Sequence, residues 1–377
     1  MAACSDNPIV STTIPNPPVT DQDLRALDSA YSSEALAVSG GASWLISTPL
    51  RSAPLAPLGA ALRITLPPAP GIATPRGAIS HSDARLLAGL ARSASRGPVI
   101  PAALLGRTFE WDPDSVAYLV SRRIGAPANG VRFILYRPDS MTSLPDSRIE
   151  IGSLDIIDQA PAVGAGLRFL IRRAVQFPKF VVSPRILDYT LTLLPAASGF
   201  TLQAAGTLTN GLPGNEERRI DFNASSAHVD LANGTSDSVA FTYDVNVPDV
   251  TVDLRYAILL DTVRDSLTIG IDYRYTRGQE QLRLVAADTN PSDILENATA
   301  HVTVNGANYA TLTVVNEERI YTDSTGTVVP DNSNDQRYED DVVNALAFGA
   351  TDASIGLWST LLIPSFILNF RFYYVVF

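Results

Sequence analysis

The feature that most constrains the fold of this 377-residue chain is a strict two-residue alternation of apolar and polar side chains in its second half. The clearest example is residues 267–276, where Leu, Ile, Ile, Tyr and Tyr alternate with Thr, Gly, Asp, Arg and Thr. Successive side chains of a β-strand point to opposite faces, so this pattern predicts a strand with one buried and one solvated face. A helix would need apolar residues three or four positions apart.

The same alternation recurs along the chain and predicts a series of strands. The predicted strands are 107–112, 115–123, 130–136, 148–157, 166–176, 187–193, 200–209, 220–223, 241–247, 252–260, 267–276, 280–287, 299–304 and 308–315. Short connections contain Asn210-Gly211, Asn233-Gly234 and Asn305-Gly306, and Asn-Gly suits tight hairpin turns. Because hairpins join antiparallel neighbours, the pattern predicts a long antiparallel meander.

The fold class expected is therefore mainly β, or α+β. A long antiparallel β-meander would form a curved sheet, a half-barrel or a sandwich, since a sheet of so many strands seldom stays open and flat. An N-terminal helix near 20–38 and apolar C-terminal helices, including 352–368, would pack on its concave face.

Composition and hydrophobic pattern together divide the chain into four predicted segments. Residues 1–19 are predicted to be a lipid-anchor or tether segment, and 20–105 a helical and Ala/Pro-rich irregular segment. Residues 106–335 would be the antiparallel β-domain. Residues 336–377 would supply the C-terminal helices and a terminal strand packed on that domain.

Composition excludes several classes of protein. With 46% hydrophobic residues the chain can build a sizeable core, which argues against disorder. The formal charge of −11 disfavours a nucleic-acid partner. A single Cys excludes a disulfide framework and Cys-based zinc sites, and three scattered His argue against a His-rich metal site. Lys179 is the only lysine among 28 cationic residues, a bias typical of a GC-rich bacterial genome.

The N-terminus indicates a lipid anchor. Met1-Ala2-Ala3-Cys4 resembles the end of a bacterial lipoprotein cleavage box, in which the Cys4 thiol would be acylated, although Met1 stands where Leu is usual. No charged and apolar leader precedes it, and such a leader is needed for export. Residues 5–19 are Pro-rich and polar, as a spacer would be. The alternative is a disordered tail with a chance free Cys. If Cys4 is acylated, the protein is membrane-anchored through lipid and belongs to the cell envelope, either outer-membrane-anchored or extracellular.

No arrangement of residues points to catalysis or to a cofactor. His81-Ser82-Asp83 places triad residues in a row, whereas a triad brings distant residues together. His228 and His301 are both expected on the solvated strand face. Residues 331–339 have oxygen ligands at alternate positions, as calcium loops do, but a solvated loop with a helix cap explains them better. The basic and aromatic segment 166–185 favours a strand pair with Arg on its solvated face, with acidic lipid headgroups as the functional alternative.

The stretch Ile100–Tyr136 carries a loose family resemblance. Its elements are Leu105–Phe109, the Trp111-Asp112 pair, Gly125-Ala126-Pro127 and Gly130–Tyr136. Leu187-Asp188-Tyr189, Asn305-Gly306 and the apolar C-terminal helix also fit. In these motifs the chain resembles uncharacterised secreted or lipoprotein-like, β-rich proteins of environmental bacteria. The resemblance implies a cell-envelope location and a β-rich fold, and it implies no activity.

These observations predict a non-enzymatic cell-envelope lipoprotein. A curved sheet with an apolar concave face could bind a lipid or other apolar ligand, lined by that face and the helix around Trp358. The alternative is a self-assembling structural surface or extracellular matrix protein, a homo-oligomer that associates through strand edges or the tail 370–377. An enzyme ranks third, because no acid, base or nucleophile can be assigned.

Overall fold

The fold was determined from a computed structural model of the chain. It describes residues 100, 102–139, 144–159, 164–176, 181–182, 184–210, 218–247, 249–263, 266–290, 299–315 and 318–329. The predicted helices at 20–38 and 352–368, and the tail 370–377, lie outside the described residues.

The described residues form strands joined by short turns, preceded by one 3-10 turn, η1 (Ala102–Leu104). The strands are β1 (Arg107–Asp112), β2 (Ala117–Val120), β3 (Gly130–Pro138), β4 (Pro145–Asp158), β5 (Ala165–Arg173), β6 (Val175–Gln176), β7 (Val181–Val182), β8 (Arg185–Ala196), β9 (Gly199–Thr209), β10 (Arg219–Leu231), β11 (Gly234–Asn246), β12 (Asp249–Asp261), β13 (Ser266–Arg277), β14 (Glu280–Asn290), β15 (Thr299–Val304), β16 (Ala307–Val315), β17 (Glu318–Asp323) and β18 (Val328–Val329). The prediction of a mainly β chain is confirmed for this part.

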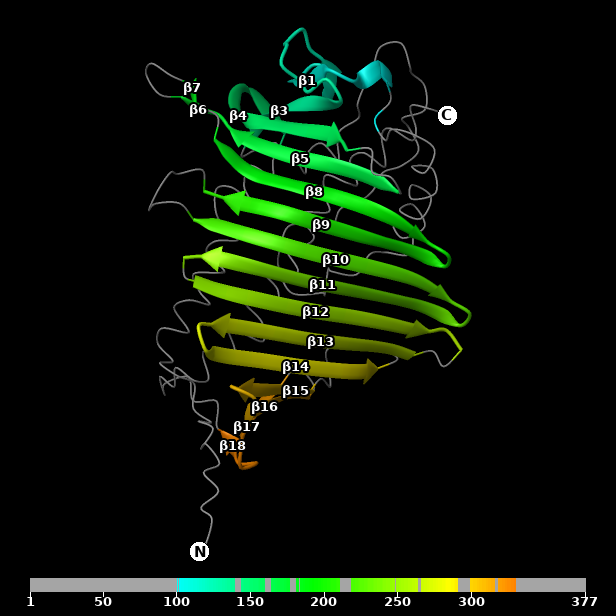
Figure 1. Cartoon of the computed structure of the whole chain (residues 1–377), viewed down its shortest axis with the longest axis vertical. Helices are drawn as coiled ribbons and strands as arrows, with labels where there is room; N and C mark the ends of the chain where they lie inside the picture. The colour runs from blue at the N-terminus through cyan, green and yellow to red at the C-terminus, as the bar shows by residue number, and fades with distance from the viewer. Residues whose placement is uncertain are drawn as a thin grey trace, which may run out of the picture.

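Sixteen of these strands belong to one sheet, and each strand from β8 to β18 pairs with the next along the chain (Figure 1). Every pairing in it is antiparallel except that of β1 with β3, which is parallel. β2 folds back beyond β1 and forms one edge, while β18 forms the other. In Figure 1 the central strands stack as a ladder and the end strands turn away from them, as the natural twist of a sheet requires.

The sheet is not closed. Its central strands are 11–13 residues long from β9 to β13, whereas edge strand β2 has four residues and edge strand β18 has two. Closure would require the two edges to pair along their length, and these short edges have little backbone to offer. The described residues also do not form the two large sheets of a sandwich, because only the small hairpin β6–β7 stands apart.

Alternation explains why the strands form and how they register. In β10 the even-numbered residues from Ile220 to His228 are buried, and their odd-numbered neighbours are more exposed. β8, β11 and β12 repeat the pattern, so the sheet has one continuous buried face. Burying a Leu, Val or Phe side chain contributes about 1.5–3 kcal/mol, so this face is the main source of stability.

Two of the three Asn-Gly turns can be compared with the structure. Asn305 and Gly306 have φ values of 49° and 83° and join β15 to β16, which confirms a hairpin with both central residues in the left-handed region. The second hairpin, between β10 and β11, is centred one residue earlier, on Ala232 and Asn233. There Gly234 is the first paired residue of β11.

Close approach of the neighbouring strand explains Gly234. Its φ is +150°, and a Cβ atom at this position would lie 1.7 Å from the carbonyl oxygen of Leu260. Gly199, the first residue of β9 after the β8–β9 hairpin, has the same φ. A Cβ atom built at Gly199 would lie 1.9 Å from the carbonyl oxygen of His228. The glycine is therefore needed for strand contact beside the turn rather than for the turn itself.

We expect Gly234→Ala to lower the free energy of unfolding by roughly 1–3 kcal/mol, because the backbone must shift to relieve the overlap. Gly270→Ala is the matched control, since a Cβ there meets nothing within 4 Å. It should leave stability unchanged or raise it by up to about 1 kcal/mol. Urea denaturation followed by circular dichroism measures both, and equal effects of the two variants would contradict this reading.

Candidate functional site

Most residues singled out in the sequence lie outside the described part of the chain. These are Cys4, His81-Ser82-Asp83, the acidic segment 331–339 and Trp358. The candidate site within the described residues is the buried face of the sheet.

Aromatic rings run across this face from strand to strand. Phe169 of β5 stacks on Tyr189 of β8, with ring centroids 4.9 Å apart, and Tyr189 contacts Phe222 of β10 at 6.0 Å. Phe222 then meets Phe241 of β11 at 6.3 Å, and Phe241 meets Tyr243 at 5.2 Å. Such pairs contribute about 0.5–1.5 kcal/mol beyond burial, so the rings join neighbouring strands into one apolar surface.

A second aromatic cluster lies at the β1 end of the sheet. Phe109 stacks on Phe133 at 4.9 Å, and Tyr118 contacts both Phe133 and Trp111 at 5.7 Å. The Tyr118 hydroxyl donates a hydrogen bond to the carbonyl oxygen of Ile134 at 3.0 Å. Burial raises the pKa of Tyr118, so the hydroxyl stays a donor. This cluster gives the aromatic residues of the Ile100–Tyr136 stretch other than Tyr136 a role in packing.

Two tyrosines nearer the middle of the sheet are different. Tyr256 of β12 is 4% exposed and Tyr273 of β13 is 0% exposed, and neither hydroxyl has a hydrogen-bond partner in the described part of the chain. Burial, with a smaller effect of the Asp237 charge, raises the pKa of Tyr256 to about 12. Burial raises the pKa of Tyr273 well above its usual value, and an interaction with Tyr243 raises this pKa further. The Tyr273 hydroxyl nevertheless makes no hydrogen bond of normal geometry with a described residue. An unsatisfied buried hydroxyl costs about 1–3 kcal/mol.

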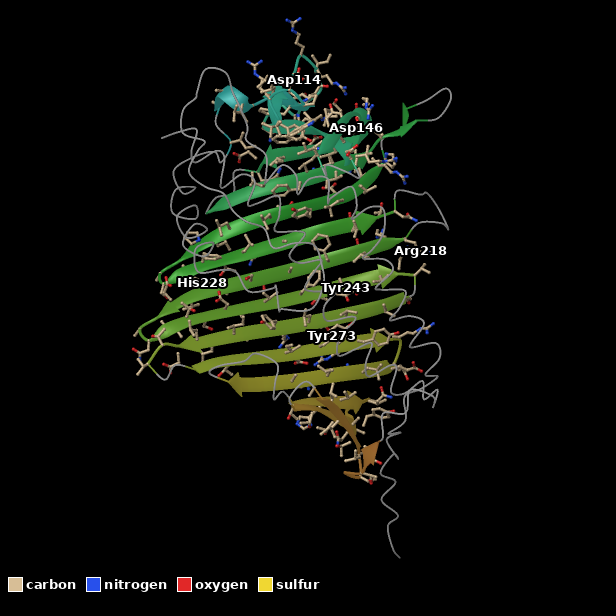
Figure 2. The ribbon with its side chains drawn as sticks, turned by 180° about the vertical axis from the view of Figure 1, so that it is seen from behind. Asp114, Asp146, Arg218, His228, Tyr243 and Tyr273 are labelled. Atoms are coloured by element: carbon tan, nitrogen blue, oxygen red, sulfur yellow. The ribbon has the colours of Figure 1, made fainter. Side chains whose placement is uncertain are left out.

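The prediction for His228 is wrong: the side chain lies on the buried face and is 4% exposed. Its ring stacks on Phe200 with centroids 5.4 Å apart. Nδ1 lies 2.6 Å from the Asp237 carboxylate of β11, and Nε2 lies 3.4 Å from Asp230. Figure 2 shows His228 near one end of the strands, with Tyr243 and Tyr273 further along them. A carboxylate beside each ring nitrogen makes His228 a cross-strand bridge at the margin of the apolar face.

The burial of His228 was readable from the pattern. It continues the even-numbered series Ile220, Phe222, Ala224 and Ser226, all buried. His228 was expected on the solvated face because its imidazole is polar, although its even-numbered position places it on the buried face. His301, in contrast, is exposed as predicted, and its Nδ1 lies 3.2 Å from the Thr311 hydroxyl of the neighbouring strand.

The opposite face carries paired charges. Arg168 and Arg172 of β5 are half-buried on it, while Phe169 and Ile171 face the core, as predicted for this basic and aromatic segment. Arg168 forms a bidentate pair with Asp188, with both distances 2.7 Å. The pair neutralises the charge of Arg168 within the sheet.

Asp155 is the most buried of these carboxylates, with a side chain 3% exposed. Arg132 donates to both of its oxygens, at 2.6 and 2.9 Å, and Arg172 donates to Oδ2 from the other side. Two guanidinium groups therefore balance one carboxylate and join β3, β4 and β5. Sequence reasoning did not identify this clamp, because its residues lie on three strands.

No protein family, curated protein or solved structure matches this chain. The family resemblance therefore stays an expectation from sequence motifs. Among the residues that the structure describes, no helix is long and apolar enough to cross a membrane. Within those same residues, no three His, Cys, Asp or Glu side chains are placed so that they could hold a metal ion.

We expect Asp155→Ala to lower the free energy of unfolding by about 3–5 kcal/mol, because two partly buried guanidinium groups lose their counter-ion. Asp221→Ala serves as the control, since Asp221 and its partner Arg219 are 40% and 46% exposed. Its effect should stay below about 1 kcal/mol. Chemical denaturation of both variants checks this, and a small effect at Asp155 would show that the clamp is not a stabilising element.

The pair Arg168–Asp188 also predicts a pH dependence. Hydrogen bonding to Arg168 holds the pKa of Asp188 below its ordinary value of 3.8, so ionised Asp188 favours the folded state. This contribution is fully present above 3.8 and is lost as the pH falls through the lower folded-state pKa. The variant Asp188→Asn should therefore be less stable at neutral pH and should lose less stability on acidification. Unfolding curves that keep a constant separation down to the most acidic pH would contradict the assignment.

Proposed function

We propose that this protein is a non-enzymatic cell-envelope lipoprotein that binds a lipid or other apolar ligand on the buried face of its sheet. The observation that supports this most directly is the apolar surface that runs from β3 to β16, on which two buried tyrosine hydroxyls have no hydrogen-bond partner among the described residues. A purely structural core normally satisfies its polar groups. Ligand sites, by contrast, are typically apolar surfaces with a few well-placed polar groups.

In this proposal the terminal segments complete the site. The apolar helix predicted at 352–368, around Trp358, and the helix predicted at 20–38 would pack on the concave face and leave room for the ligand. Acylation of Cys4 would tether the domain to the membrane through the spacer 5–19, close to the source of such a ligand.

The open sheet supports a second candidate, self-assembly into a surface or matrix structure. Edge strand β2 exposes Val120 at 44%, and the segments before and after it expose Val116 at 42% and Ile124 at 94%. Exposed apolar residues beside an unpaired strand edge are a route to pairing between copies. The short length of β2 and β18 limits such pairing, which is why assembly ranks second.

Native mass spectrometry of protein starting at Ser5, produced in bacteria and purified without detergent, separates the two. The ligand proposal predicts a monomer carrying a removable adduct of lipid mass, reduced in Trp358→Ala and retained in Val120→Lys. Assembly predicts multimers without adduct, reduced in Val120→Lys or by removal of residues 370–377. A bare monomer would contradict both proposals.

A further inference from the structure

The placement of Tyr256 and Tyr273 narrows the chemistry of the ligand. The register pairs Tyr256 with Ile271 and Leu254 with Tyr273, so the two tyrosines are diagonal neighbours on β12 and β13. Residues in this relation are about 7–8 Å apart, within reach of long aromatic side chains. The two side chains are therefore close enough on the buried face to contact one bound molecule.

Within the described residues, neither hydroxyl forms a hydrogen bond of normal geometry, although Tyr243 interacts with the hydroxyl of Tyr273. Tyr256 is 96% buried and Tyr273 fully buried, and in the described part of the chain no acceptor satisfies either hydroxyl. A tyrosine hydroxyl is protonated at neutral pH, and burial raises the pKa of both residues further. Tyr118 shows the alternative in the same sheet, because its hydroxyl is satisfied by the carbonyl oxygen of Ile134.

The charge near this pair disfavours an anionic ligand group. Asp237 acts electrostatically on Tyr256, and Asp230 lies on the far side of His228 from Asp237. A carboxylate or phosphate brought next to Tyr256 would face the like charge of Asp237, whose side chain is 18% exposed. Asp230 is 68% exposed, so water screens its charge. A neutral oxygen acceptor meets no such penalty.

We propose that Tyr256 and Tyr273 donate hydrogen bonds to a neutral oxygen acceptor of the bound lipid, such as an ester or amide carbonyl or an alcohol. The inference rests on the proposed ligand-binding function and adds the class of ligand. The apolar chain of such a lipid would lie along the aromatic surface, and its polar group would lie at β12 and β13.

The test compares three probes of equal chain length, namely a fatty-acid methyl ester, the free fatty acid and the alkane, by their displacement of a fluorescent apolar dye from the full chain. The wild-type protein should bind the ester more tightly than the fatty acid or the alkane. Tyr256→Phe combined with Tyr273→Phe should weaken ester binding about tenfold or more, the worth of one hydrogen bond, and leave alkane binding unchanged.

Thermal unfolding without ligand gives an independent readout. Because Tyr256→Phe and Tyr273→Phe each remove an unsatisfied hydroxyl, their unfolding midpoints should stay level or rise. Tyr118→Phe, the matched control, should lower the midpoint and leave the preference for the ester intact. Lower midpoints in the Tyr256 and Tyr273 variants would mean that these hydroxyls have partners, which overturns the inference.

The outcomes separate this inference from the function on which it rests. If the alkane and the ester bind equally well and the double variant binds both unchanged, the inference is wrong and the ligand-binding function stands. If the wild-type protein binds none of the three probes, the function fails and the inference fails with it. Tighter binding of the free fatty acid than of the ester would contradict the choice of a neutral acceptor.

Discussion

Burial of one face of each strand is the constraint on which the rest of this structure depends. Because side chains alternate strictly along a strand, a slip of one residue would move every apolar side chain of that strand into water. The register from β8 to β14 continues without a shift, and aromatic pairs such as Phe169–Tyr189 and Phe222–Phe241 join neighbouring strands on the buried side. The alternation within each strand places its apolar residues on one face, and the ring contacts between strands make that face continuous.

The two faces of the sheet stabilise it in different ways. On the solvated face, Arg–Asp pairs such as Arg132–Asp155 and Arg283–Asp272 join neighbouring strands. On the buried face the polar groups are few, and Tyr256 and Tyr273 are the ones whose hydroxyls stay unsatisfied there in the described residues. The charged groups of these pairs therefore have partners within the sheet. The two neutral hydroxyls have no acceptor among the described residues. The functional proposal accordingly concentrates on the buried face.

Sequence reasoning succeeded where one strand carries the whole signal and failed where several strands must meet. The bounds of β1 and β15 match the predicted 107–112 and 299–304, and the Asn305-Gly306 hairpin has the predicted geometry. His228 was misplaced because the polarity of its ring was given more weight than the parity of its position in β10. The partners of Asp155 lie 23 and 17 residues away in sequence, so no local pattern could reveal them. The lack of an acceptor for the Tyr256 hydroxyl among the described residues is likewise a property of its surroundings rather than of its own strand.

The sequence by itself determined that the described residues between Arg107 and Val329 form largely antiparallel strands with one apolar face, because a two-residue period and turn-forming residues are local properties of the chain. The tertiary structure alone decided that the sheet stays open, that β1 pairs in parallel with β3, and that His228 lies between two carboxylates. It also decided which buried tyrosines find a partner. The physical reason is that closure, strand order and hydrogen-bond satisfaction depend on groups distant in sequence, whose positions are set only when all strands are assembled.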